Sequence, residues 1–356
     1  MLKTSSAAFI EVQRAAGARF LDEGTLAVDF GDARGEYTSA RDDCTVFDAS
    51  SRAQLELTGA DRAKFLHNFC TNNILLLKPG QGCEAFCTNV KGRVVGHVFV
   101  FCDTDSLWLE TVPNAQETLR AHLERYIITE DVQLHDRGAQ YGELLVSGPR
   151  SAERLNQLGL NTGALGLLEH KKIEHAGESI SIRRVDFLAQ PGFLLSCARE
   201  NLAPLWRQLV GGGIRPAGST ALEVLRIEAG MPLYGIDITD ENLAQEVGRT
   251  RQAISFTKGC YLGQEPIARI DALGHVNREL RGLRLQAGRL PERGATVLSE
   301  DGAKEVGTIT SAARLSDDQP GVALAYLRSG SNAPGTTVSV RFTDESVQAV
   351  VFQPAR

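Results

Sequence analysis

Residues Ile254–Arg269, ISFTKGCYLGQEPIAR, gather a cysteine, two glycines, a lysine and both amide and carboxylate side chains in one short segment. We expect Ala253–Phe256 to form the end of a short apolar strand. Gly259 then permits a positive φ and a close approach of the backbone to a ligand. Gly263 is the expected N-cap of a helix, in which Pro266 still lies early enough to be tolerated.

Cys260 has the surroundings of a reactive thiol. It stands between Lys258 and the N-terminus of the expected helix, and both a cation and the positive end of a helix dipole favour the thiolate form of a cysteine. Glu265, in the first helical turn, would complement the same dipole. The alternative is that Cys260 is a small buried apolar side chain, as free cysteines usually are.

A family signature favours the first interpretation. Lys258–Glu265, KGCYLGQE, resembles the KGC-[FY]-x-GQE signature of the YgfZ-type folate-binding proteins, which are relatives of the glycine-cleavage T-protein, an aminomethyltransferase. The resemblance implies that Cys260 and Lys258 carry the chemistry, with Lys258 helping to keep the thiol ionised. It also implies tetrahydrofolate contacts from Tyr261, Gln264 and Glu265. The role of the thiol stays open between nucleophile, redox partner and transient cluster ligand.

The resemblance extends over most of the chain. Leu57–Asp61, LTGAD, resembles the first strand and helix of the T-protein family, and Leu225–Gly230, LRIEAG, resembles its LRLEAG segment. Val306–Ser311 resembles part of the C-terminal barrel of that family. The family implies three lobes arranged as a ring around a central cavity that holds tetrahydrofolate.

Three further side chains are candidate folate ligands. Arg226 and Glu228 lie two residues apart on an expected helix, so they point to different faces and one of them can face the cavity. A guanidinium can pair with the glutamate tail of folate, and a carboxylate can accept from the amino group of the pterin. The alternative is an ordinary pair on a helix surface. Gln190 falls on or near the folate-contacting glutamate of the family's GYTGE-type motif.

Two departures from the family pattern argue against the T-protein reaction itself. Aminomethyltransferases carry an acidic pair in the second strand of a hairpin, and Gly96 and His97 stand where that pair belongs. Gln190 likewise replaces a glutamate, which weakens pterin recognition. Lys91–Arg93 instead resembles the KG[KR] turn of YgfZ-type members. We expect His97, on an apolar strand, to be a packed histidine rather than a base.

Composition and charge exclude several classes of protein. The chain has 356 residues, of which 42% are hydrophobic and 23% charged, as in an ordinary globular protein. The formal net charge of −6 gives no reason to expect direct binding to nucleic acid or to a membrane. Seven cysteines without CxxC or Cys/His metal spacing favour a reduced, cytoplasmic chain without a metal site. We expect neither a signal peptide nor a membrane span.

Apolar periodicity and turn residues predict an α+β fold with two similar, ferredoxin-like antiparallel lobes and a small C-terminal β-barrel. The core is expected over residues 1–275, with internal boundaries near 50 and 140, and the barrel over 276–356. A helix is expected at 5–16 and loops, with a hairpin, at 22–37. In the first lobe we expect strands at 54–58, 82–88, 93–102, 107–112 and 128–134 and helices at 59–70 and 113–127. In the second lobe we expect strands at 141–147 and 193–197, a hairpin at 173–185 and helices at 149–158, 200–210 and 219–229. A loop is expected at 230–250. Barrel strands are expected at 280–285, 295–298, 305–313, 321–326, 337–342 and 346–352.

The resulting hypothesis is a tetrahydrofolate-binding protein of the YgfZ type. The resemblance links such proteins to the assembly or repair of iron–sulfur clusters and, through cluster enzymes, to tRNA modification. Its partners would be reduced folate and iron–sulfur proteins or their assembly machinery. The alternative is a folate-dependent one-carbon transferase acting on another donor, with His97 or Glu228 as the base. A third alternative is a pure folate-binding module.

Overall fold

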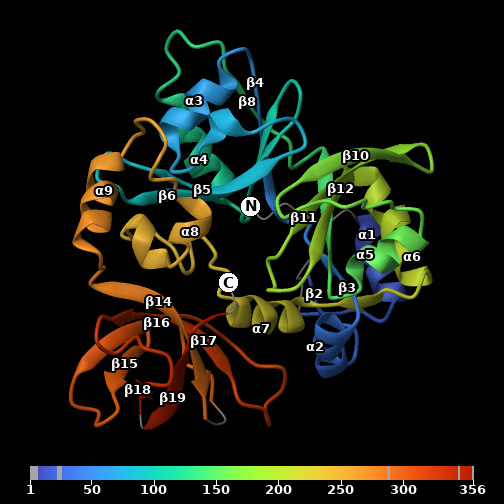
Figure 1. The fold of residues 1–356 in the computed structure, drawn as a ribbon. Helices are drawn as coiled ribbons and strands as arrows, with labels where there is room; N and C mark the ends of the chain where they lie inside the picture. The colour runs from blue at the N-terminus through green and yellow to red at the C-terminus, as the bar shows by residue number, and fades with distance from the viewer. Residues whose placement is uncertain (1–6, 22–25, 287–288, 344, 355–356) are drawn as a thin grey trace.

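The computed structural model describes residues 7–21, 26–286, 289–343 and 345–354. Figure 1 shows three lobes, the first at the top, the second at the right and a barrel at the bottom. Helix α7 (Ser219–Ala229) lies between the second lobe and the barrel. The predicted α+β class with a C-terminal barrel is confirmed.

The first lobe is a five-stranded antiparallel sheet with the strand order β5-β6-β7-β4-β8. Its strands are β4 (Ala53–Thr58), β5 (Gly82–Thr88), β6 (Val94–Cys102), β7 (Leu107–Thr111) and β8 (Gln133–Asp136). Its helices are α3 (Arg62–Phe69), the 3-10 turn η1 (Ile74–Leu76) and α4 (Ala115–Glu124). Alternate residues of β4, Leu55 and Leu57, point to one face of the sheet, where they join Phe65 and Leu119 in a buried core.

The second lobe repeats the order of elements of the first. They are β9 (Tyr141–Ser147), α5 (Ser151–Gln157), β10 (His170–His175), β11 (Glu178–Val185), β12 (Gly192–Ala198), η2 (Arg199–Asn201), α6 (Leu202–Gly211) and β13 (Arg215–Ala217). The sheet has the order β10-β11-β12-β9-β3-β13, so β3 (Thr45–Asp48) is the one addition to the first lobe's pattern. The expected similarity of the two halves is therefore visible in their topology.

The N-terminal residues complete the second lobe. Helix α1 (Ala7–Ala15) packs against α6 through Phe9, whose ring meets that of Trp206 edge to face at 5.5 Å. Strands β1 (Arg19–Phe20) and β2 (Ala27–Asp29) pair, and α2 (Ala33–Asp42) packs on α7. The other faces of the two sheets share an aromatic core, in which Phe99 of β6 lies 4.7 Å from Phe187 of the second lobe.

The barrel closes in the order β14-β17-β16-β15-β18-β19. Its strands are β14 (Arg278–Leu285), β15 (Thr296–Ser299), β16 (Glu305–Ala313), β17 (Val322–Arg328), β18 (Thr337–Arg341) and β19 (Ser346–Phe352). Before it, η3 (Ala244–Val247), α8 (Thr250–Ala253) and α9 (Gln264–Leu273) return the chain to the first lobe, where Ile254 and Ile267 pack with Phe86. The domain boundaries near 50, 140 and 275 stay predictions.

Four local predictions were wrong. Residues 33–37 belong to helix α2, which Asp32 caps by accepting from the backbone N–H of Gly35 at 2.9 Å. Ala253 ends helix α8, so no strand precedes the turn of Cys260. Residues 128–132, predicted as the start of a strand, form an irregular segment before β8. The positive φ falls on Gly263, at 83°, and not on Gly259. Parts of three predicted segments, at 5–6, 22–25 and 355–356, lie outside the described residues.

Candidate functional site

Gln190 and Glu228 line the same cavity. Its volume is about 210 Å³, and it lies where the loop after β11, helices α2 and α7 and the barrel meet. Its apolar lining comes from Leu188, Ala189, Leu225, Ala229 and Phe352, and its other polar lining from Arg41, Arg284 and Gln353. The fold thus joins two sequence-predicted site residues that are 38 positions apart.

Glu228 is held by two donors at the wall of this cavity. Its Oε2 accepts from the hydroxyl of Tyr37 at 2.8 Å and from Nη1 of Arg41 at 3.2 Å. Burial and the bond to Glu228 raise the pKa of Tyr37, so its hydroxyl remains a donor. Within the described residues, Oε1 of Glu228 accepts no hydrogen bond, which leaves one carboxylate oxygen for a ligand.

The turn before Gln190 has an unusual backbone. Ala189 lies in the left-handed region with φ 55°, where a side chain is disfavoured and glycine is the usual residue. Its N–H closes the turn by donating to the carbonyl of Asp186 at 2.9 Å. In a GYTGE-type motif a glycine precedes the glutamate, and here Ala189 precedes Gln190. A left-handed conformation at a residue with a side chain is strained, and such strain is typical of functional sites.

Arg226 faces away from the Gln190–Glu228 cavity and is buried. Its Nε donates to Glu223 at 2.8 Å, its Nη1 to Asp237 at 3.0 Å and its Nη2 to the hydroxyl of Ser311 at 2.9 Å. All three nitrogens are thus engaged, Nε within α7, Nη1 with the loop after α7 and Nη2 with the barrel strand β16. The expected separation of Arg226 and Glu228 on different helix faces is observed, and it favours Glu228 as the ligand-facing residue.

The turn that carries Cys260 lies in another part of the molecule. Cys260 is exposed and lies in the turn before α9, separated from it by Tyr261, Leu262 and Gly263; Figure 1 shows α9 at the left edge, away from α7 at the lower centre. Tyr261 is buried, Gln264 is half-buried and Glu265 is exposed in the first turn of α9. None of these side chains lines the Gln190–Glu228 cavity.

Lys258 connects this turn to the end of α3 through hydrogen bonds. Its Nζ donates to the carbonyl oxygens of His67, Cys70 at 2.6 Å and Asn72 at 3.0 Å, and lies 4.7 Å from the centroid of the Tyr261 ring. Burial lowers the pKa of Lys258. Because an ammonium has three protons and three carbonyls take them, none is left to donate to Cys260. This geometry argues against a hydrogen bond from Lys258 to the thiol, and the role of Lys258 at Cys260 stays a prediction.

Gly96 and His97, which stand where aminomethyltransferases carry the acidic pair, both face packed protein interior. A Cβ on Gly96 would meet Leu119 of α4 at 3.1 Å, so position 96 faces the core of the first lobe. His97 points to the opposite side, where its Nε2 lies 2.7 Å from Oε1 of Glu84. His97 is buried, as expected of a packed histidine.

Two buried ionic clusters were not found from the sequence. In the first, burial favours the neutral form of Glu84, but Arg249 and His97 outweigh it and lower the pKa of Glu84 to about 2. In the second, Arg183 donates to Glu110 of β7 and, at 3.0 Å, to Glu143 of β9, which links the two lobes. Burial and the charge of Glu110 raise the pKa of Glu143 well above its ordinary value. A lone acid within an apolar strand is the signal that identifies such residues.

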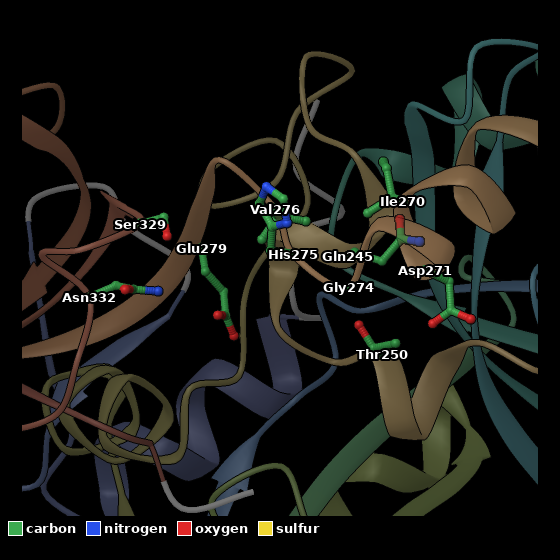
Figure 2. Close-up of a pocket in the computed structure, with 10 residues that line it drawn as sticks. All are labelled: Gln245, Thr250, Ile270, Asp271, Gly274, His275, Val276, Glu279, Ser329 and Asn332. Carbon is green, nitrogen blue, oxygen red and sulfur yellow. The ribbon is translucent and has the colours of Figure 1, made fainter.

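A larger cavity of about 340 Å³ lies between α9 and the barrel. Figure 2 shows the side chains around it, among them Gln245, Thr250, Asp271, His275 and Glu279. It contains none of the residues that the sequence predicts for a folate site. The Gln190–Glu228 cavity is therefore the candidate site for that ligand.

The family of the chain is established by its match to two domain descriptions. Residues 4–258 match the GCVT N-terminal domain, and residues 278–355 match the glycine cleavage T-protein C-terminal barrel domain. Together these matches cover most of the sequence. The chain belongs to the glycine-cleavage T-protein family.

Similar proteins include transferases of this family. A putative chloroplastic transferase of Arabidopsis thaliana is 28% identical over 349 residues, which cover 97% of this chain and 78% of the relative. The aminomethyltransferase of Rippkaea orientalis is 26% identical, covering 92% of this chain and 90% of the relative. The crystal structure of the glycine cleavage system aminomethyltransferase T from Bartonella henselae superposes with a TM-score of 0.87 at 21% identity, covering 100% of this chain and 98% of that one. At that identity the likeness shows the fold alone.

Among the described residues, no helix is both long and apolar enough to cross a membrane.

Proposed function

We propose that this chain is a reduced-folate-binding protein of the YgfZ type. It acts in the cytoplasm, supports the assembly or repair of iron–sulfur clusters and thereby serves tRNA modification. The observation that carries the folate proposal is the cavity that brings Gln190 and Glu228 together. The KGCYLGQE signature around the exposed Cys260 supports the YgfZ-type assignment within the family.

The donor and acceptor chemistry of the cavity fits tetrahydrofolate. A pterin presents amino and ring N–H donors, and Glu228 Oε1 and the Gln190 amide can accept them. The glutamate tail presents carboxylates, and Arg41 and Arg284 supply cations at the same cavity. Phe352 and Leu188 provide apolar contact for the ring. The bound folate would carry a one-carbon unit, and the residues of the chain would bind and orient it.

The alternative of a one-carbon transferase remains compatible with family membership. Its weakness is that each nominated base already has partners, because His97 is buried against Glu84 and Oε2 of Glu228 accepts from Tyr37 and Arg41. Formation of 5,10-methylene-tetrahydrofolate from methylamine donors is the observation that would favour this alternative.

Calorimetry with tetrahydrofolate under anaerobic conditions tests the proposal. Wild-type protein should bind saturably, and Glu228→Gln should weaken binding by about ten- to a hundredfold, the effect of losing a charged hydrogen-bond partner. Glu153→Gln, at an exposed site on α5, is the matched control and should bind as wild type. No saturable heat at millimolar folate would refute folate binding.

A further inference from the structure

Acidic residues are absent from two segments of an otherwise acidic chain. The sequence holds 44 acidic and 38 basic residues, yet residues 62–83 and 247–264 contain no aspartate or glutamate. Between Asp61 and Asp103 the one acid is Glu84, which is buried and bound by Arg249 and His97. No carboxylate from these segments therefore reaches solvent.

The two segments lie together although they are far apart in sequence. The N–H of Ser255 donates to the carbonyl of Thr71 at 2.9 Å, and the Thr71 hydroxyl donates to the carbonyl of Ala253 at 2.6 Å. The N–H of Leu262 donates to the carbonyl of Asn68 at 2.9 Å. The hairpin between β5 and β6 joins them through the Thr88 hydroxyl, which donates to the carbonyl of Leu262 at 2.6 Å. We call the exposed residues of 62–83, 88–93 and 247–264 the acid-free face.

The acid-free face is also rich in exposed apolar side chains. Ten large apolar side chains are exposed in the described part of the chain, and four of them are Leu75, Leu76, Val90 and Phe256. Leu76 is 73% exposed and Phe256 45%. Four of the ten exposed large apolar side chains thus fall in these three segments, and a concentration of exposed apolar surface favours an interaction site.

Unpaired cations accompany these apolar side chains. Lys78, Lys91 and Arg251 are exposed, and no ion pair engages their side chains within the described residues. The exposed thiol of Cys260 lies in the same segments. The face thus combines apolar contact, positive charge and one accessible thiol.

We propose that the acid-free face docks a protein surface with an apolar centre and an acidic rim, which would bring that protein to Cys260. The proposal rests on the proposed function and names the chemistry of its partner. Charge complementarity selects an acidic partner, and an apolar centre is typical of protein interfaces. A nucleic acid would require a denser array of cations than the exposed Lys64, Lys78, Lys91 and Arg251 of this face.

A pair of reactive peptides tests this directly on the full chain. One is an amphipathic leucine–glutamate peptide with an N-terminal bromoacetyl group, and the other carries lysine in place of glutamate. The Cys260 thiolate displaces bromide and forms a carbon–sulfur bond, so mass spectrometry measures how fast each peptide reaches it. The acidic peptide should react at least about tenfold faster at low salt, and the ratio should fall as ionic strength rises.

Variants separate docking from a change in the thiol. Arg251→Glu combined with Lys78→Glu should abolish the preference, and Phe256→Ser should slow the acidic peptide. Arg328→Glu, an exposed position on the barrel strand β17, should leave it unchanged. Iodoacetamide should alkylate Cys260 equally in all four proteins. Equal rates for the two peptides in the wild type would overturn the proposal.

Two further outcomes complete the test. Stronger protection of Cys260 by duplex DNA or phosphatidylglycerol vesicles than by unreactive acidic peptide would assign the face to another partner and would also overturn the proposal. Tetrahydrofolate binding is measured on the same variants and should match wild type. A wild type without folate affinity would refute the proposed function, while the peptide preference would still decide the docking proposal.

Discussion

Nη1 of Arg226 lies 3.0 Å from Oδ2 of Asp237 in a buried ion pair. Oδ1 of the same carboxylate accepts from the hydroxyls of Thr310 and Ser311, both at 2.6 Å on strand β16. The pair thus fastens α7, the loop after it and the barrel at one point. Arg226, which the family resemblance suggests as a folate ligand, here links α7 to the barrel.

Arg226→Met should destabilise the protein without removing folate binding. It leaves the Asp237 carboxylate buried without its cation, and breaking a buried pair in this way costs about 3–5 kcal/mol in the free energy of unfolding. Urea unfolding measures the loss, and calorimetry on the folded variant measures the affinity for tetrahydrofolate. Weaker folate binding at unchanged stability would make Arg226 a ligand instead.

Cys260 should be alkylated faster than the other six cysteines. It is the exposed one, whereas Cys44 and Cys197 are buried, and burial raises the pKa of each to about 12. Brief treatment with limiting iodoacetamide followed by mass-spectrometric mapping gives the order of reaction. Labelling spread evenly over the cysteines would return Cys260 to a structural role.

Lys258→Met should leave that alkylation rate nearly unchanged but lower stability. The carbonyls at the end of α3 lose charge-assisted bonds, each worth about 1.5–3 kcal/mol. Thermal unfolding and iodoacetamide kinetics on the same sample separate the two effects. A large fall in the Cys260 rate, with the fold intact, would show that the ammonium does act on the thiol.

Glu143→Gln should stabilise the protein more at pH 8 than at pH 5. The pKa of Glu143 is raised in the folded state, so the folded protein holds one more proton than the unfolded chain above pH about 4.5. Wild-type stability therefore falls as pH rises from that value toward the folded pKa. Glutamine keeps the neutral form and removes this dependence. Parallel stability curves for the two proteins would show that Glu143 is ionised in both states.

The chain should not perform the T-protein reaction at a useful rate. A positioned acid–base group contributes about 10²–10⁴ in rate, and here position 96 faces Leu119 while His97 is bound to Glu84. The assay couples the purified chain to the glycine-cleavage partners and follows methylene-tetrahydrofolate. Turnover within about tenfold of a genuine T-protein would contradict this reading of the strand.

Local signals made much of the fold predictable. Helix α7 was predicted with its observed bounds, because Gly218 and Gly230 end the apolar pattern on both sides, and Gly230 takes the left-handed C-cap with φ 66°. Helix α2 was missed because its composition is polar and contains Gly35. That helix is held instead by Glu36, which accepts from the N–H groups of Phe30 and, at 2.9 Å, of Gly218 far along the chain.

The site was predictable only in part, because its polar partners are distant in sequence. The family motif and helical spacing made Arg226 and Glu228 both candidates, but spacing alone could not show which of the two faces the cavity. The structure shows that it is Glu228, because the guanidinium of Arg226 is hydrogen-bonded to Asp237 and Ser311 on the other side of the helix. Lys258 likewise meets carbonyls of the first lobe, near Cys70, that no local pattern connects with it.

A crystal structure of the chain soaked with tetrahydrofolate tests the central claim most directly. We predict density for the pterin between Gln190 and Glu228, with the glutamate tail toward Arg41 or Arg284. Density in the larger cavity beside His275, or beside Cys260, would contradict the account.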